Sequence, residues 1–273
     1  MPEVEIIKRI LEPQITGNLI EILEILNNQI IAYPDAEIFT KMITGQTIIN
    51  MSRRGKFLTI HFKSGDKLVL HLRMTGQLLV MPKDTPMEKH THLLIYLEGG
   101  NQLRYIDVRR FGRFWFFKKD EIDVLTGQDK LGLEPLDKNL TSHFLKGKLG
   151  KRKKAIKDML HDQSIIAGIG NIYSDEILYA AGIYPETKCT AMDDEKWGRL
   201  AKQIPEVIAW GINTNEMTPE EYLEGRGKEY RNISHLRVYG RAAQLCLVCQ
   251  TVIEKISLGG RSSCYCPECQ RKK

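Results

Sequence analysis

Alternation of apolar and polar side chains is the clearest pattern in the first half of the chain. Residues 58–62 and 68–72 each alternate, and the turn-forming segment Ser64-Gly65-Asp66 separates them. A period of two places one face of a strand in the core, so this stretch predicts a β-hairpin. The same pattern predicts a second hairpin around Glu98-Gly99-Gly100-Asn101 and one further strand, at residues 93–97, 103–106 and 114–117.

Helical periodicity replaces this alternation at the N-terminus and after about Asp120. In residues 2–12, Val4, Ile7 and Leu11 share one face, and we expect Pro13 to end that helix. In the second half, helices are predicted at residues 155–161 and 172–181 and within 192–222. The glycine-containing segment 165–171 joins the first two, and two helices joined by such a turn are a common DNA-binding device.

These patterns predict an α+β fold, in which a β-sandwich with an N-terminal helix precedes a helical region. The 273 residues can bury a sizeable core, and 42% hydrophobic with 27% charged residues is typical of a globular protein. No apolar run approaches the roughly 18 residues that cross a bilayer, which argues against a membrane protein. No apolar leader is recognisable, so we expect a cytoplasmic location.

Four cysteines near the C-terminus have the spacing of a metal site. Cys246-x2-Cys249 and Cys266-x2-Cys269 would bring four thiolates within reach of one tetrahedral Zn²⁺, which would fold a segment too short to build its own core. A ribbon that only stabilises the tail or contacts a protein is one alternative, and disulfides are another. Only Cys266 completes the second pair, so we expect Cys264 outside the ligand set and Cys189 as a lone thiol.

Positive charge is concentrated on the same segment. Residues 226–273 contain 10 Lys/Arg and 3 Asp/Glu, a net charge of +7, whereas the other 225 residues sum to −1. Residues 146–157 add a local run of seven Lys/Arg without an acid. A small basic module that is stabilised by a metal ion is expected of a segment that binds a polyanion.

The N-terminus offers a candidate nucleophile. Pro2 follows Met1, and a small second residue normally permits removal of the initiator methionine, which would leave a secondary amine. An α-amino group titrates near 7.7–8.0, against about 10.4 for lysine, so such an amine could attack an aldehydic carbon like C1′ of deoxyribose. Glu3 could transfer the proton needed to open the sugar. The alternative is an ordinary helix N-terminus, with acids that complement its dipole.

Seven short motifs follow one another in a fixed order along the chain: Pro2-Glu3-Val4-Glu5, Arg53-Arg54-Gly55-Lys56-Phe57-Leu58, His71-Leu72-Arg73-Met74-Thr75-Gly76, Lys89-His90-Thr91-His92, Asp107-Val108-Arg109-Arg110-Phe111-Gly112, Ala167-Gly168-Ile169-Gly170-Asn171-Ile172-Tyr173 and Val238-Tyr239-Gly240-Arg241. With the four-cysteine finger behind them, they resemble the formamidopyrimidine-DNA glycosylase/endonuclease VIII family of base-excision repair enzymes. The resemblance runs nearly end to end.

The resemblance implies a monomeric bifunctional DNA glycosylase/AP lyase that acts on damaged double-stranded DNA and carries one structural Zn²⁺. In such an enzyme Pro2 is the Schiff-base nucleophile and Glu3 the proton donor, and Lys56 and Arg261 assist β- and δ-elimination. Met74 resembles the wedge that fills the space left by an extruded base, with Arg109 facing the orphaned base and Phe111 stacking into the duplex. The phosphate ligands implied are His90, Arg152 and Asn171.

The implied organisation has three domains: a catalytic β-sandwich at 1–125, a helix–two-turn–helix domain at 126–236 and the zinc finger at 237–273. The opening departs from the family pattern Pro-Glu-Leu-Pro-Glu-Val-Glu, since the chain reads Pro2-Glu3-Val4-Glu5. Either Leu-Pro-Glu is deleted, or Pro2 corresponds to the second proline. A non-catalytic binder of damaged DNA with an eroded N-terminal active site is therefore a second hypothesis, and the lesion class stays open.

Overall fold

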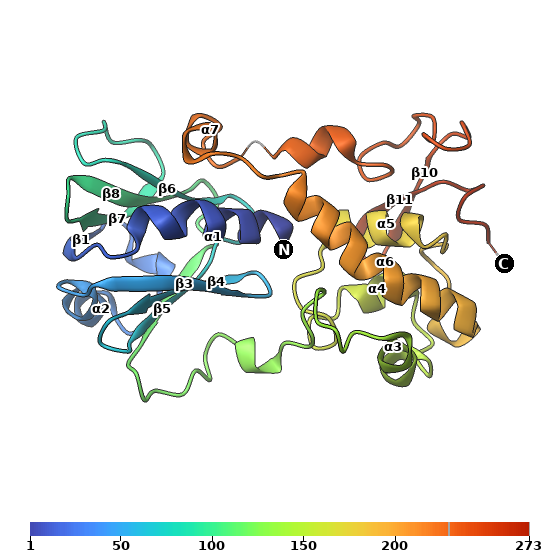
Figure 1. Ribbon diagram of the computed structural model, residues 1–273, viewed down its shortest axis with the longest axis horizontal. Helices are drawn as coiled ribbons and strands as arrows, with labels where there is room; N and C mark the ends of the chain where they lie inside the picture. The colour runs from blue at the N-terminus through green and yellow to red at the C-terminus, as the bar shows by residue number, and fades with distance from the viewer. Residues whose placement is uncertain (229, 273) are drawn as a thin grey trace. The chain divides into compact units, whose positions relative to one another are not determined.

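The computed structural model describes residues 1–228 and 230–272 (Figure 1). Glu229 and Lys273, which the predicted helical domain and zinc finger include, lie outside the described residues. The chain forms two compact units, which we call the sandwich unit (Glu3–Asp129 with Glu216–Tyr230) and the helical unit (Met1–Pro2, Lys130–Asn215 and Arg231–Lys273). Among the described residues, no helix has the length and apolarity that crossing a membrane requires. The three-domain division stays a prediction.

Two sheets form the core of the sandwich unit, and their strands pair antiparallel except for the parallel pair β2–β9. One sheet has the strand order β1-β7-β8-β6 and the other β2-β9-β5-β4-β3. Tyr105 of β8 and Phe114 of β9 meet edge to face with ring centroids 4.9 Å apart, so side chains of the two sheets interlock. The strands are β1 (Ile20–Ile25), β2 (Ile31–Tyr33), β3 (Ile48–Arg54), β4 (Phe57–Phe62), β5 (Lys67–His71), β6 (Gly76–Pro82), β7 (Thr91–Leu97), β8 (Asn101–Asp107) and β9 (Arg113–Phe117).

Both predicted hairpins are confirmed. Strand β4 pairs with β5 through Leu58↔Leu70 and Ile60↔Leu68, and β7 pairs with β8 through Ile95↔Leu103. The paired apolar residues are buried, as the alternating pattern requires. The predicted β-sandwich with an N-terminal helix is therefore correct.

Helix α1 (Pro2–Ile15) begins where predicted but does not stop at Pro13. The expectation that Pro13 ends the helix is wrong, because the helix continues for two residues to Ile15, whose side chain is fully buried. Burial of that side chain outweighs the loss of one backbone hydrogen bond near a helix end. Two shorter helices, α2 (Ala36–Ile43) and α7 (Pro219–Glu224), complete the sandwich unit.

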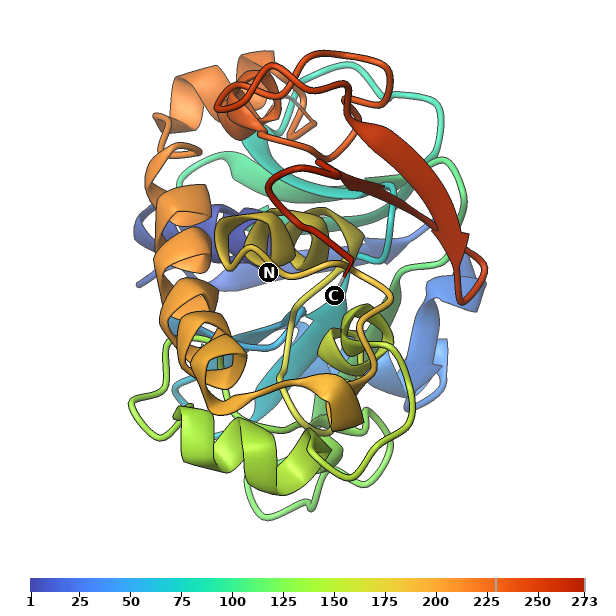
Figure 2. The ribbon, with the colours of Figure 1, turned by 90° about the vertical axis from the view of Figure 1, so that its right-hand side faces the viewer.

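The helical unit contains α3 (Ser142–Leu149), α4 (Ile156–Leu160), α5 (Asn171–Ala180) and α6 (Asp194–Asn213) (Figure 2). The predicted pair of helices corresponds to α4 and α5, and the segment between them turns at Gly168, whose φ of +84° suits glycine. A two-stranded hairpin, β10 (Glu254–Leu258) and β11 (Arg261–Tyr265), lies beside α5 in the same unit.

Candidate functional site

Two turns at one edge of the sandwich unit carry exposed side chains that a folded core does not need. Met74 lies between β5 and β6, and its side chain is 76% exposed. Arg109 and Phe111 lie between β8 and β9, and Phe111 is 48% exposed. Since β6 pairs with β8 from Gly76↔Asp107 onward, the two turns leave the sheet side by side.

The Arg109 side chain contacts both of the others. Arg109 Nη1 lies 3.0 Å from the Met74 sulfur, and the Arg109 guanidinium lies 4.6 Å from the centre of the Phe111 ring. A cation over a ring face is an attractive arrangement, so the group is partly ordered before any ligand binds. The structure thus brings together the wedge and the two companions that the resemblance implies.

The buried carboxylate of Asp107 holds both turns. Its Oδ1 accepts hydrogen bonds from the Thr75 hydroxyl, in the Met74 turn, and from the Arg109 backbone N–H at 3.1 Å. Its Oδ2 accepts from the Tyr105 hydroxyl at 2.9 Å and from the Gly112 N–H at 3.0 Å. Burial raises the pKa of Asp107, but the hydrogen bonds lower it more, and the net pKa lies below its ordinary value. The sequence pattern alone predicts no role for Asp107.

His90 lies at the same edge of the sandwich unit. Its backbone is in the left-handed region, with φ +68°, and its carbonyl accepts a hydrogen bond from the Asp107 N–H at 3.0 Å. His92, which is buried, places Nε2 2.8 Å from the Asp107 carbonyl oxygen. Asp107 therefore bonds to His90, to Arg109 and to the residues that directly follow Met74 and Phe111, although up to 37 positions separate the four predicted residues in sequence.

Lys56 lies on a third turn, which connects β3 and β4 and in which Gly55 has φ +57°. Arg53 connects this turn to α1: its Nε donates to Glu5 Oε2 at 2.8 Å, and its Nη1 donates to the Gly55 carbonyl at 2.9 Å. Burial raises the pKa of Glu5, but the bonds and charges of Arg53 and Arg9 lower it more, so the net pKa falls. The N-terminal helix and the Lys56 turn are thus held together by a charged pair that is only slightly exposed.

His71 is a functional candidate that the sequence analysis missed. It ends β5 immediately before the Met74 turn, and its Nδ1 accepts a hydrogen bond from the Arg73 N–H at 3.0 Å. Burial, together with the positive charges of Arg73 and Lys56, lowers the pKa of His71 to about 4. The imidazole is therefore neutral at pH 7, as its acceptor role demands.

Pro2 and Glu3 are the first two residues of α1. Pro2 is buried and Met1 is only 3% exposed. While Met1 is attached, the Pro2 nitrogen is an amide nitrogen and has no nucleophilic lone pair, because amide resonance delocalises it. Removal of Met1 is therefore required before the Pro2 nitrogen can act as an amine.

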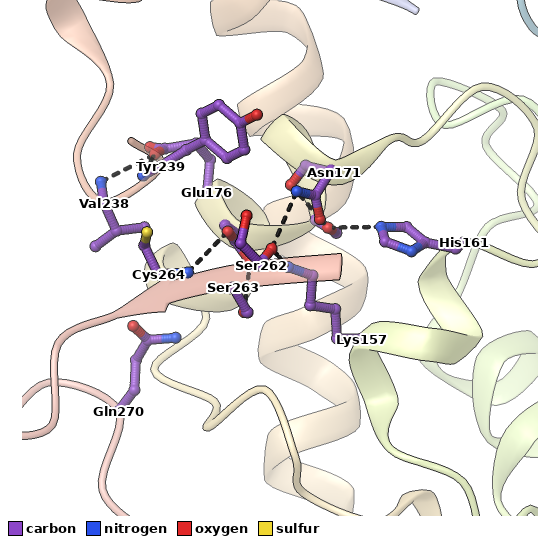
Figure 3. A network of polar contacts seen from close by, with 12 residues as sticks. Lys157, His161, Asn171, Glu176, Val238, Tyr239, Ser262, Ser263, Cys264 and Gln270 are labelled. Atoms are coloured by element: carbon purple, nitrogen blue, oxygen red, sulfur yellow. Dashed lines mark hydrogen bonds and ion pairs between the residues drawn. The ribbon is translucent and has the colours of Figure 1, made fainter. Parts of the chain in front are cut away.

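The helical unit brings Asn171 close to the residue that follows Arg261, and Figure 3 labels Asn171 and that residue, Ser262. Asn171 is the first residue of α5, and its side-chain amide donates to the Ser262 carbonyl at 3.0 Å. Ser262 follows Arg261, which is exposed at the tip of the β10–β11 hairpin. Gly259, with φ +54°, shapes this tip, and a side chain there would meet Asp158 Oδ1 at 2.6 Å. Asn171 and Arg261 thus belong to one fixed arrangement.

Arg152 lies apart from that arrangement, in the exposed segment between α3 and α4. The neighbouring Lys151, Lys153 and Lys154 are also exposed. Within the described part of the chain, no hydrogen bond or ion pair holds the Arg152 side chain, whereas its backbone N–H donates to the Leu149 carbonyl at 2.8 Å. An exposed cationic face of this kind can bind polyanions through charge alone.

The four predicted cysteines form one cluster. The sulfur atoms of Cys246, Cys249, Cys266 and Cys269 all lie within 4.8 Å of one another, and the Cys249–Cys266, Cys249–Cys269 and Cys246–Cys269 separations are 3.3, 3.6 and 3.9 Å. A tetrahedron with Zn–S bonds of about 2.3 Å has sulfur–sulfur edges of about 3.8 Å, so one Zn²⁺ fits. Disulfides, which need about 2.05 Å, are excluded.

The remaining cysteines and the surroundings of the cluster agree with a structural zinc site. Cys189 is buried, and burial raises the pKa of its thiol to about 11, so it is an inert core thiol. Cys264 is outside the four-sulfur cluster, as predicted. The Tyr179 hydroxyl lies 3.2 Å from Cys246 Sγ and is buried, which makes it a hydrogen-bonding partner of a metal ligand.

Comparison with known families assigns nearly every part of the chain. Residues 1–114 match the family described as formamidopyrimidine-DNA glycosylase N-terminal domain, residues 131–221 match the formamidopyrimidine-DNA glycosylase H2TH domain, and residues 243–271 match the zinc finger found in FPG and IleRS.

Individual proteins are similar over the whole length. The formamidopyrimidine-DNA glycosylase of Desulforamulus reducens is 40% identical, over 100% of this chain and 99% of the relative. The Lactococcus lactis Fpg protein in complex with FAPY-dG-containing DNA superposes with a TM-score of 0.90 at 34% identity, and coverage is 99% of both chains. Its complex with DNA containing an abasic site gives a TM-score of 0.91 at 33% identity, over 100% and 99% of the two chains.

Proposed function

This chain belongs to the formamidopyrimidine-DNA glycosylase family, and we propose that it is a DNA glycosylase with AP lyase activity that acts on damaged double-stranded DNA. Ring-opened purines and abasic sites are the substrate classes that we propose to test first, since similar proteins bind DNA with these lesions. The proposed compartment is the bacterial cytoplasm, where the chromosome lies.

The observation that carries the proposal is the Met74–Arg109–Phe111 group on two turns fixed by Asp107. A reaction at C1′ of a stacked nucleotide requires that the nucleotide leave the helix. A protruding methionine can fill the vacated space, a guanidinium can hydrogen-bond the orphaned base, and an aromatic ring can stack between bases. Both apolar side chains are exposed, Met74 at 76% and Phe111 at 48%, so both are available to insert into a duplex.

In the proposed reaction, the Pro2 amine attacks C1′ once Met1 has been removed. As the N–C1′ bond forms, the base leaves with its bonding electron pair and takes up the proton that the amine loses. Cleavage of the C1′–O4′ bond then gives the Schiff base, which allows loss of the 3′ phosphate by β-elimination and of the 5′ phosphate by δ-elimination. Glu3 transfers the proton that opens the sugar. Lys56 and Arg261 contact phosphates and support the two eliminations, while His90, Arg152 and Asn171 bind the backbone.

A second function is favoured by one specific observation, the burial of Met1 and Pro2. If Met1 is retained, no N-terminal amine of proline exists, and the chain is a non-catalytic binder of damaged DNA. The wedge group and the basic segments serve that function equally well. The two functions differ only in whether a covalent bond to the sugar forms.

Intact-mass measurement and borohydride trapping separate the two functions. We expect the purified protein to lack one methionine and to form a reducible adduct with an abasic-site duplex. Pro2→Gly should form less adduct, because it replaces the secondary amine, while Asp84→Asn, an exposed change in the sandwich unit, should trap like wild type. Tight binding of the abasic duplex by wild-type protein without any adduct would establish the non-catalytic function instead.

A further inference from the structure

A buried ion pair between α4 and α5 lies next to the β10–β11 hairpin, whose tip carries Arg261. Lys157 of α4 and Asp175 of α5 are each 0% exposed, and Lys157 Nζ lies 2.6 Å from Asp175 Oδ1. Burial lowers the pKa of the Lys157 ammonium and raises the pKa of the Asp175 carboxyl, while the attraction between the two opposes both shifts. No step of the proposed reaction uses either residue.

The hydrogen bonds that complete this pair all go to β11. Asp175 Oδ1 also accepts from the Ser263 hydroxyl at 2.8 Å, and Asp175 Oδ2 accepts from the Cys264 N–H at 3.0 Å. Lys157 Nζ donates to the Ser262 carbonyl at 3.0 Å. Three consecutive residues, Ser262 to Cys264, are thus fixed to the two helices, and they begin one position after Arg261.

The next residue of α5 anchors the start of the finger in the same way. Glu176 is buried, and its carboxylate accepts hydrogen bonds from three consecutive N–H groups, those of Arg237, Val238 and Tyr239, at 2.9–3.1 Å. Two adjacent carboxylates on one helix therefore hold both ends of the metal-stapled segment. Asp175 holds the hairpin end and Glu176 holds the entry.

A buried ion pair contributes little net stability, because desolvation of two charges offsets much of their attraction. Its stronger effect is geometric, since an unpaired charge in the core is costly and only one register of β11 completes every bond. A shift of β11 by one residue would turn the Ser263 hydroxyl away from Asp175, because successive side chains of a strand point to opposite faces.

We propose that Asp175 is a positioning residue for Arg261: by fixing the register of β11 on α5, it sets where the guanidinium at the hairpin tip meets DNA phosphate. The inference rests on the proposed function only in taking duplex DNA as the ligand. It needs no catalysis, because a misplaced Arg261 weakens phosphate binding whether or not the sugar is attacked.

The test is a double-mutant cycle between Asp175→Asn and Arg261→Ala, measured as the Kd for an abasic-site duplex. In the wild-type background we expect Asp175→Asn to weaken binding about tenfold. In the Arg261→Ala background the same change should have almost no effect, because the residue that it positions is gone. An equal loss in both backgrounds would overturn the proposal, since it would show a general effect on folding.

A second variant, Ser263→Ala, tests the proposal even if the Asp175→Asn protein does not fold. The serine change removes one hydrogen bond to Asp175 and leaves the charge pair with Lys157 intact. Its matched control is Ser257→Ala, on the exposed face of β10 in the same hairpin. We expect the first to weaken binding only when Arg261 is present and the second to leave binding unchanged, with zinc content equal in all variants. Equal effects of the two serine changes would refute the proposal. Borohydride trapping by wild type, run in parallel, tests the proposed enzyme separately.

Discussion

At the scale of the residue, Asp107 fixes two turns through hydrogen bonds. Its carboxylate accepts from the Thr75 hydroxyl and the Gly112 N–H, and these residues directly follow Met74 and Phe111 in the chain. Gly112 is required there, since a Cβ would lie 1.7 Å from the Tyr105 hydroxyl. The wedge group is therefore specified by a buried carboxylate and one obligatory glycine.

Asp107→Asn removes the charge and keeps the shape of the side chain. Loss of hydrogen bonds to a charged acceptor should lower the free energy of unfolding by about 2 kcal/mol at pH 7. Because the folded-state pKa of Asp107 lies below its ordinary value, this contribution is present above about pH 4 and is lost as the pH falls through the folded pKa. Urea unfolding at several pH values should show the wild-type advantage shrinking toward low pH. A constant difference would contradict this, and exposed Asp84→Asn is the control.

Tyr179 is the residue that we expect to tune the zinc site. Its buried hydroxyl can donate to Cys246 Sγ, and such outer partners stabilise metal ligation. Tyr179→Phe should therefore release zinc to a chelator about tenfold faster, with little change in packing. The colorimetric release rate is the measurement. Tyr96→Phe, which removes a hydroxyl bonded to Glu24 in the sandwich unit, should release zinc at the wild-type rate. Identical rates for all three proteins would exclude the role of Tyr179.

At the scale of the element, the β5–β6 turn depends on the neutral form of His71. Protonation of Nδ1 would replace the acceptor of the Arg73 N–H with a second donor. The pKa of His71 is lowered from its ordinary value of 6.5 to about 4. The contribution of neutral His71 to the free energy of unfolding is therefore complete above pH 6.5 and is lost as the pH falls toward 4.

The corresponding prediction compares wild type with His71→Asn, which can accept the same hydrogen bond without titrating. Between pH 7 and pH 4.5, wild type should lose unfolding free energy relative to the variant, measured by chemical denaturation at each pH. Parallel curves for the two proteins would show that protonation of His71 does not act on this turn.

Elements with a regular local pattern could be predicted from the sequence, and elements fixed by distant partners could not. The β4–β5 hairpin follows from alternation alone, and the zinc ligands follow from two x2 spacings. Strand β1 was not predicted, because its buried residues Ile20 and Leu23 are three positions apart, across a register shift between Ile20 and Ile22. The roles of Asp107 and Asp175 depend on bonds to residues 32 and 88 positions away, which no local pattern contains.

At the scale of the whole molecule, the charge distribution makes a quantitative prediction about DNA binding. Excess positive charge lies in residues 226–273 and in the run at 146–157, while the chain outside 226–273 sums to −1. Each phosphate that a cation neutralises releases counterions, so the logarithm of affinity falls with the logarithm of salt concentration by about 0.9 per contact. The slope therefore counts contacts, independently of any catalytic step.

Replacing Lys151, Lys153 and Lys154 with Gln should reduce that slope by up to about 3 for an undamaged duplex, because all three are exposed beside Arg152. The control replaces three exposed lysines of the sandwich unit, Lys41, Lys63 and Lys118, and changes net charge equally. If binding responds to net charge alone, both triple variants will lower affinity alike. If the run at 146–157 contacts phosphate, only the first will change the slope, and unequal slopes at equal net charge would locate the DNA-contacting face on the helical unit.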